Sequence, residues 1–196
     1  YTALAWFIAC SAGYTWYSKH HAHKRACLSN TLNLYREDWM RVMLQRGNRM
    51  SDTNVVGNLE RNGAFFASSC LLILAGIITA MGYTTEAMKV FATMPLSPVP
   101  SREVWELRLL VLTVVFIYAF FKFTWSMRMY NFLAVMIGSA PLAEDTKTTP
   151  AGREAFAKSA GKICDLAGDA FNLGLRSYYY ALAVVAWFFH PVAFMI

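Results

Sequence analysis

The sequence predicts an all-α membrane protein with four transmembrane helices, and three observations lead to this fold class. The 196 residues are 57% hydrophobic and 15% charged, whereas soluble globular domains are about 45–50% apolar and about 25% charged. The apolar residues are gathered in four blocks, and most of the charged residues lie between these blocks. In the hydrocarbon core of a bilayer a backbone must satisfy its own hydrogen bonds, so each apolar block is expected to form a helix.

The four predicted spans cover about residues 1–17, 63–83, 107–124 and 173–196. The first span is short because the sequence begins inside an apolar run, and we expect the native chain to begin earlier. The second span contains no charged residue, whereas the fourth is interrupted by Arg176 and by Pro191. Together the spans are expected to form one transmembrane domain over residues 1–196.

Lysine and arginine residues set the predicted orientation of these spans. The segments 18–62 and 125–172 carry most of the cations, whereas the loop 84–106 carries only Lys89 and Arg102. Short basic segments beside a span stay on the cytoplasmic side of the membrane. The two basic segments are therefore predicted to be cytoplasmic, with both termini on the other side. The net charge of +6 is expected to interact with anionic lipid headgroups, and no nucleic-acid partner is expected.

The cytoplasmic segments are predicted to contain helices of their own. Residues 31–46 place apolar side chains at helical spacing, which predicts an amphipathic helix. Asp52 is predicted to cap a second helix that continues into the span 63–83. A helix from Arg102 to Gly138 would extend beyond the bilayer, and its apolar run 132–137 is expected to pack on the amphipathic helix.

Three stretches of the sequence are the most distinctive for comparison with known families: Asn58–Ser69, Lys122–Phe132 and Asn172–Ala183. With these stretches the chain resembles, over nearly its whole length, the family called domain of unknown function 599, described as multi-pass membrane proteins of bacteria and plants. The resemblance implies the four-span fold and a location in the bacterial inner (cytoplasmic) membrane. It implies no activity, because it supplies no established catalytic or binding residues.

Two histidines of the first cytoplasmic segment are weak candidates for metal binding. His20 and His23 would share one face of a helix, and neutral imidazole is a common metal ligand. A site needs three or four ligands and the spacing supplies no others, so a basic collar at the membrane interface is the preferred interpretation. His190 lacks a second intramembrane histidine that a bis-histidine haem would need. No cofactor is predicted, and a bound phospholipid is compatible with the sequence.

Six polar residues are predicted to lie at similar depth, near the cytoplasmic ends of the spans. Charges near a membrane are costly unless they are paired or hydrated. These residues could therefore hold an anionic lipid headgroup or substrate, or they could pair with carboxylates such as Glu60 and Asp165 and fix the ends of the helices. The structural interpretation is favoured, and both stay open. The six residues are Arg61, Lys122, Arg128, Asn131, Asn172 and Arg176.

The sequence shows no Ser-His-Asp set, phosphate-binding loop, dinucleotide fingerprint or zinc motif. We therefore expect no enzymatic activity. The chain is expected to be an accessory or scaffold subunit that packs against a larger membrane complex, with lipids and other membrane subunits as its partners. The alternative is a small homo-oligomeric transporter or channel with an anion or lipid-headgroup site at the Arg/Asn cluster. A membrane enzyme that uses His20 and His23 ranks last.

Overall fold

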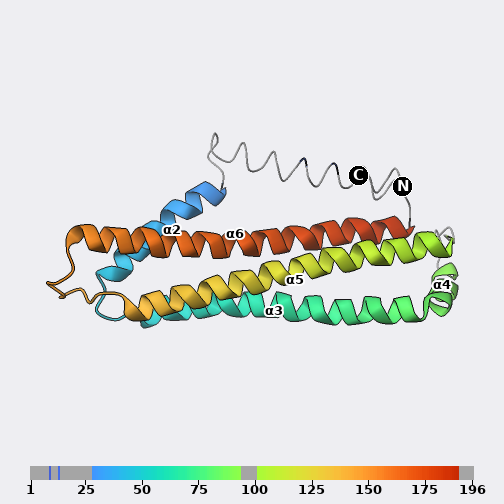
Figure 1. Cartoon of the computed structure of the whole chain (residues 1–196), viewed down its shortest axis with the longest axis horizontal. Helices are drawn as coiled ribbons and strands as arrows, with labels where there is room; N and C mark the ends of the chain where they lie inside the picture. The colour runs from blue at the N-terminus through green and yellow to red at the C-terminus, as the bar shows by residue number, and fades with distance from the viewer. Residues whose placement is uncertain (1–8, 10–12, 14–27, 94–100, 190–196) are drawn as a thin grey trace. The chain divides into compact units, whose positions relative to one another are not determined.

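The structure, a computed structural model, describes residues 28–93 and 101–189 together with Ala9 and Gly13. Over these residues it contains helices and no strand, which confirms the predicted all-α class (Figure 1). The helices within this part of the chain are α2 (Leu28–Leu44), α3 (Met50–Gly82), α4 (Thr84–Ala92), α5 (Arg102–Ser139) and α6 (Pro150–Phe189). The predicted amphipathic helix and the long helix after Arg102 thus correspond to α2 and α5.

Two of the described helices, α3 and α5, are long and apolar enough to cross a membrane. Only 17% of the most apolar window of α3 and 33% of that of α5 are buried, whereas a helix in the core of a soluble protein is mostly buried. Large apolar side chains such as Leu72 on α3 and Val114 on α5 remain exposed. This exposed apolar surface is compatible with a membrane location.

Four spans are predicted, and two of the described helices, α3 and α5, are apolar and long enough to be spans. The first predicted span, 1–17, lies outside the described residues except for Ala9 and Gly13. The fourth begins on α6, which does not qualify over its described length, because Arg176 and the three tyrosines 178–180 lower its hydropathy. The remaining residues of this predicted span, 190–196, lie outside the part of the chain that the structure describes.

The chain divides into two compact units, which are described separately. Unit 1 comprises Tyr1–Tyr17, Phe66–Phe121 and Leu173–Ile196, and unit 2 comprises Ser18–Phe65 and Lys122–Asn172. Each of α3, α5 and α6 therefore contributes one segment to each unit, whereas α2 belongs to unit 2 and α4 to unit 1.

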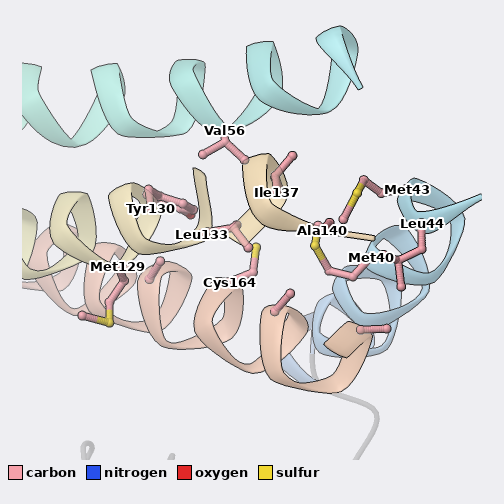
Figure 2. Close-up of a cluster of buried hydrophobic side chains, with 13 residues drawn as sticks. Met40, Met43, Leu44, Val56, Met129, Tyr130, Leu133, Ile137, Ala140 and Cys164 are labelled. Atoms are coloured by element: carbon pink, nitrogen blue, oxygen red, sulfur yellow. The ribbon is translucent and has the colours of Figure 1, made fainter. Parts of the chain in front are cut away.

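The core of unit 2 is a cluster of buried hydrophobic side chains from four helices (Figure 2). Met40 and Met43 of α2 meet Leu133 and Ile137 of α5, and each of the four is at most 3% exposed. Burying a side chain of this size stabilises the fold by about 1.5–3 kcal/mol. Residues 133 and 137 belong to the predicted apolar run 132–137, so the expectation that this run packs on the amphipathic helix is confirmed.

Small residues of α6 allow α2 to lie close to its backbone within unit 2. A Cβ atom at Gly161 would lie 3.0 Å from Cα of Glu37, and one at Gly168 would overlap the guanidinium of Arg36. Small residues at such spacing let two helices approach closely. The buried small residues on this part of α6 are Ala157, Ala160, Gly161, Cys164, Ala167, Gly168 and Ala170.

Tyr178 of α6 organises contacts within unit 1. Its hydroxyl donates a hydrogen bond of 3.3 Å to the carbonyl oxygen of Phe66 and lies 3.5 Å from Sγ of Cys70 on α3. The Tyr178 ring also makes edge-to-face contacts with Phe66 and with Phe116 of α5, at centroid distances of 5.6 and 5.4 Å. Such aromatic pairs prefer this geometry, so one tyrosine links three helices of the unit.

Candidate functional site

The six polar residues that the sequence grouped together are divided between the two units. Arg176 lies on the α6 segment of unit 1. The other five belong to unit 2, where Arg61 lies on α3, Lys122, Arg128 and Asn131 lie on α5, and Asn172 lies on α6.

Contacts of three of these residues in unit 2 show how their polar groups are used. Asn131 Nδ2 donates a hydrogen bond of 3.2 Å to Oε1 of Glu60 and so joins α5 to α3; Glu60 is a partner that the structural interpretation names. Arg61 donates to a side chain one turn earlier on α3. The guanidinium of Arg128 lies 5.5 Å from the ring centroid of Phe132, one turn later on α5. Both arginines are exposed, so their charges are accessible on the surface of unit 2.

The predicted histidine site cannot be placed, because His20, His23 and His190 all lie outside the described residues. Within the described ranges, no group of three or more histidine, cysteine, aspartate or glutamate residues is arranged to hold a metal ion.

Asp52 is the most deeply buried carboxylate of the described chain, with 1% of its surface exposed. Its Oδ1 accepts hydrogen bonds of 2.7 Å from Nε1 of Trp39 and 2.7 Å from Nη1 of Arg46. Its Oδ2 is buried and has no partner among the described residues. The prediction that Asp52 caps the second helix is wrong. The Asn48 side chain instead accepts a hydrogen bond from the backbone N–H of Met50, where α3 begins.

Arg49 closes the end of α5. Its guanidinium lies 3.5 Å from the carbonyl oxygen of Ile137 in the last turn of α5, and it donates to the carbonyl oxygens of Ala140, at 2.8 Å, and Pro141, at 2.5 Å, which directly follow the helix. The last carbonyls of a helix have no partner within the helix, and a cation there also interacts favourably with the helix dipole. The start of α3 is thereby attached to the end of α5 inside unit 2.

Two ion pairs fasten α2 to α6. Arg41 makes a forked contact with Glu154, at 3.0 Å from Nε to Oε2 and 2.7 Å from Nη2 to Oε1. This hydrogen bonding by Arg41 lowers the pKa of Glu154 and raises the pKa of Arg41. Arg36 lies 3.3 Å from Asp165. Burial raises the pKa of Asp165 despite the opposing effect of Arg36.

Cys164 lies in the core of unit 2 and is 1% exposed. Burial raises the pKa of this thiol to about 11. A reactive cysteine needs a thiolate and access to solvent, so Cys164 serves as a small apolar residue of the core.

Unit 1 contains a buried arginine that the predicted site did not include. Arg108 of α5 is 6% exposed, and its Nη1 lies 3.4 Å from the carbonyl oxygen of Phe188 on α6. The guanidinium carbon lies 5.3 Å from the Trp187 ring and 5.6 Å from the Phe188 ring, within the range of cation–π interactions. Its Nε is buried and has no acceptor among the described residues.

Trp105 lies one helical turn before Arg108 on α5 and shares its neighbours. Its ring meets Phe188 edge to face at 5.1 Å and Phe91 of α4 at 5.3 Å. The indole Nε1 is also buried without an acceptor among the described residues. Two polar groups of unit 1, both hydrogen-bond donors, are therefore enclosed in an aromatic environment.

Sequence analysis missed this pair although a signal was present. Arg108 stands just inside the predicted span 107–124, where a charged residue is costly and therefore marks a functional hypothesis. Trp105 precedes it at a spacing that places both on one helix face. Their common contact with Phe188, which lies 80 residues further along the chain, could only come from the tertiary structure.

The sequence model of a family described as "Protein of unknown function, DUF599" matches residues 2–196. No curated protein and no solved structure matches the chain.

Proposed function

We propose that this chain, which belongs to the DUF599 family of unknown function, is a four-span inner-membrane protein. We propose further that it acts as a non-catalytic accessory subunit of a larger membrane complex, with unit 2 as its docking element on the cytoplasmic side. The observation that carries the proposal is the way α2 is held in unit 2. Its polar side chains are used to attach it to neighbouring helices, and a row of apolar side chains is left exposed.

The attachment of α2 supports a rigid docking element. Trp39 bonds to α3 through Asp52, Arg41 bonds to α6 through Glu154, and Arg36 does so through Asp165. Together with the buried methionines Met40 and Met43, these contacts hold the C-terminal half of α2. A preorganised surface loses less entropy on binding than a mobile one, so a fixed α2 is suited to partner recognition.

The exposed side of α2 supplies the apolar surface for a partner. Leu34 and Tyr35 are 67% and 68% exposed, and Val42 is 43% exposed. An amphipathic helix normally turns its apolar residues toward a core or a membrane surface. Residues of this type left exposed on a fixed helix therefore favour a protein partner or the headgroup region as the covering surface, and we propose a protein partner.

The experiment is native extraction of the full chain in mild detergent, followed by measurement of the mass of the complex and identification of its subunits. We expect a second polypeptide in constant stoichiometry. The double substitution Leu34→Ser and Tyr35→Ser should release this subunit while helix content is preserved. Leu142→Ser, at a position of unit 2 that is 65% exposed, is the matched control and should leave the complex intact.

Recovery of the chain as a monomer, or as an oligomer of itself alone, would contradict the accessory role. A homo-oligomer would favour the second candidate, a small transporter or channel with a lipid-headgroup or anion site. The observation in its favour is that Arg61 and Arg128 are exposed and make their contacts within their own helices. Unchanged anion or lipid retention in a folded Arg128→Ala variant would count against that site.

A further inference from the structure

Two unpaired hydrogen-bond donors lie one turn apart on the same face of α5 in unit 1. The Nε atom of Arg108 and the Nε1 atom of Trp105 are both buried, and neither has an acceptor among the described residues. Both side chains contact the ring of Phe188, at 5.6 Å for the guanidinium carbon and 5.1 Å for the indole centroid. Two side chains from adjacent turns, each with an unpaired donor, therefore contact one aromatic residue.

Leaving these donors unpaired is energetically unfavourable. A buried donor without an acceptor costs about 1–3 kcal/mol, and a charged one costs more. The Phe188 carbonyl lies 3.4 Å from Nη1 of Arg108, which is beyond the usual range of a strong hydrogen bond. The rings of Trp187 and Phe188 stabilise the charge but offer no lone pair in the guanidinium plane. The missing component is an acceptor, and the positive charge of Arg108 favours an anionic one.

The carboxylates nearest along the chain do not supply this acceptor. Glu106 accepts a hydrogen bond of 2.8 Å from Arg102, and both side chains are exposed, whereas Arg108 is 6% exposed. Within the described residues no ion pair involving Arg108 is present. The partner of Arg108 and Trp105 is therefore expected from outside the described chain.

We propose that Arg108 and Trp105 bind the phosphate group of a phospholipid headgroup or a free phosphate ion. A guanidinium presents parallel N–H donors that match two oxygens of a phosphate, and the indole N–H adds a donor to a further oxygen. Arg108 lies six residues after the start of α5, about 9 Å along the helix axis. That depth corresponds to the headgroup boundary of a span, where arginine and tryptophan are commonly found.

The test uses the full chain purified in detergent, with phosphatidylglycerol and inorganic phosphate as separate probes. Binding is measured by native mass spectrometry for the lipid and by phosphorus analysis after dialysis for the ion. Trp105→Phe keeps the ring that contacts Phe188 and removes only the donor, and Arg108→Gln removes the charge. We expect each to weaken binding of the effective probe at least tenfold, which corresponds to about 1.4 kcal/mol.

Two control variants remove the same chemical groups elsewhere. Arg102→Gln deletes an exposed cation at the same end of α5, and Trp125→Phe deletes an indole that is 51% exposed. Both should bind the probe as the wild type does. Helix content measured by circular dichroism confirms that each variant is folded, and Trp105→Phe decides the question if Arg108→Gln does not fold.

Retention of lipid alone identifies a headgroup as the source, and retention of inorganic phosphate alone identifies the free ion; either supports the site. Binding of neither probe by the wild type would overturn the proposal. Binding that is equal in Trp105→Phe and in the two controls would overturn it as well. These outcomes are independent of whether the chain is an accessory subunit, because they concern the protein without a partner.

Discussion

Trp39 donates a hydrogen bond of 2.7 Å from its indole Nε1 to Oδ1 of Asp52, thirteen residues further along the chain. The carboxylate is 1% exposed and receives a second hydrogen bond from Arg46. This contact joins the amphipathic helix α2 to the first turns of α3 across the short connection between them. A neutral donor, a charged donor and a buried acceptor thus determine how the chain turns inside unit 2.

Replacing Trp39 with phenylalanine should destabilise the protein by about 1–3 kcal/mol, because a buried carboxylate loses one of its two hydrogen bonds. The measurement is the thermal or denaturant unfolding midpoint in detergent. Trp125→Phe, which changes an exposed indole, is the control and should shift the midpoint little. Equal stability of the two variants would show that the Trp39–Asp52 contact contributes nothing.

Replacing Arg49 with methionine should loosen the end of α5. The carbonyl oxygens of Ala140 and Pro141 would lose their charged donor, at a cost of about 1–3 kcal/mol. Hydrogen–deuterium exchange of peptides that cover residues 134–143 should become faster. Arg61→Met removes an exposed arginine of α3, twelve residues further along the chain, and should leave exchange in this region unchanged. Fast exchange in both variants, or in neither, would argue against the capping role.

The ion pair between Arg41 and Glu154 should make stability depend on pH in the acidic range. Hydrogen bonding by Arg41 lowers the pKa of Glu154 below its ordinary value of 4.5. The pair therefore stabilises the fold fully above pH 4.5, and this contribution is lost as the pH falls through the lowered pKa. The difference in unfolding midpoint between wild type and Glu154→Gln should narrow below that pH. A difference that stays constant on acidification would contradict this assignment.

The contribution of Asp165 to stability should depend on pH in the opposite direction. Burial raises its pKa above the ordinary value of 3.8, so the folded protein binds this proton more tightly than the unfolded chain does. Its contribution to stability is then greatest below pH 3.8 and decreases as the pH rises through the raised pKa. The unfolding midpoint of the wild type should therefore fall relative to that of Asp165→Asn as the pH rises through this range. A relative gain over the same range would refute the predicted direction.

Substituting Gly161 with alanine should separate α2 from α6. The added Cβ would lie 3.0 Å from Cα of Glu37, a backbone atom that cannot move without shifting the helix, and overpacking of this kind costs about 1–3 kcal/mol. Gly138→Ala is the matched control, because no atom lies within 4 Å of a Cβ there. Alanine in a helix is favoured over glycine by up to about 1 kcal/mol. Unfolding midpoints should therefore move in opposite directions, and a stabilised Gly161→Ala variant would contradict the close approach.

Much of the helical organisation could be predicted from the sequence, because it depends on local patterns. The apolar spacing of residues 31–46 predicts α2, and the absence of proline from Arg102 to Gly138 predicts the length of α5. The prediction that Asp52 caps α3 is wrong, although aspartate near a helix start is typical of a cap. Its actual role depends on Trp39 and Arg46, which are brought to it only when α2 and α3 pack.

The sequence by itself determined that the chain is helical, that it contains apolar stretches of membrane-spanning length, and that its cations lie in the segments between them. These properties follow from side-chain chemistry and chain periodicity, which act over a few turns. Only the tertiary structure decided that Arg108 and Trp105 face Phe188, and that α2 is fastened to α6 through Arg41 and Glu154. Such contacts join residues about 80 to 110 positions apart, and whether a polar group finds a partner at that separation is settled by helix packing, not by local sequence.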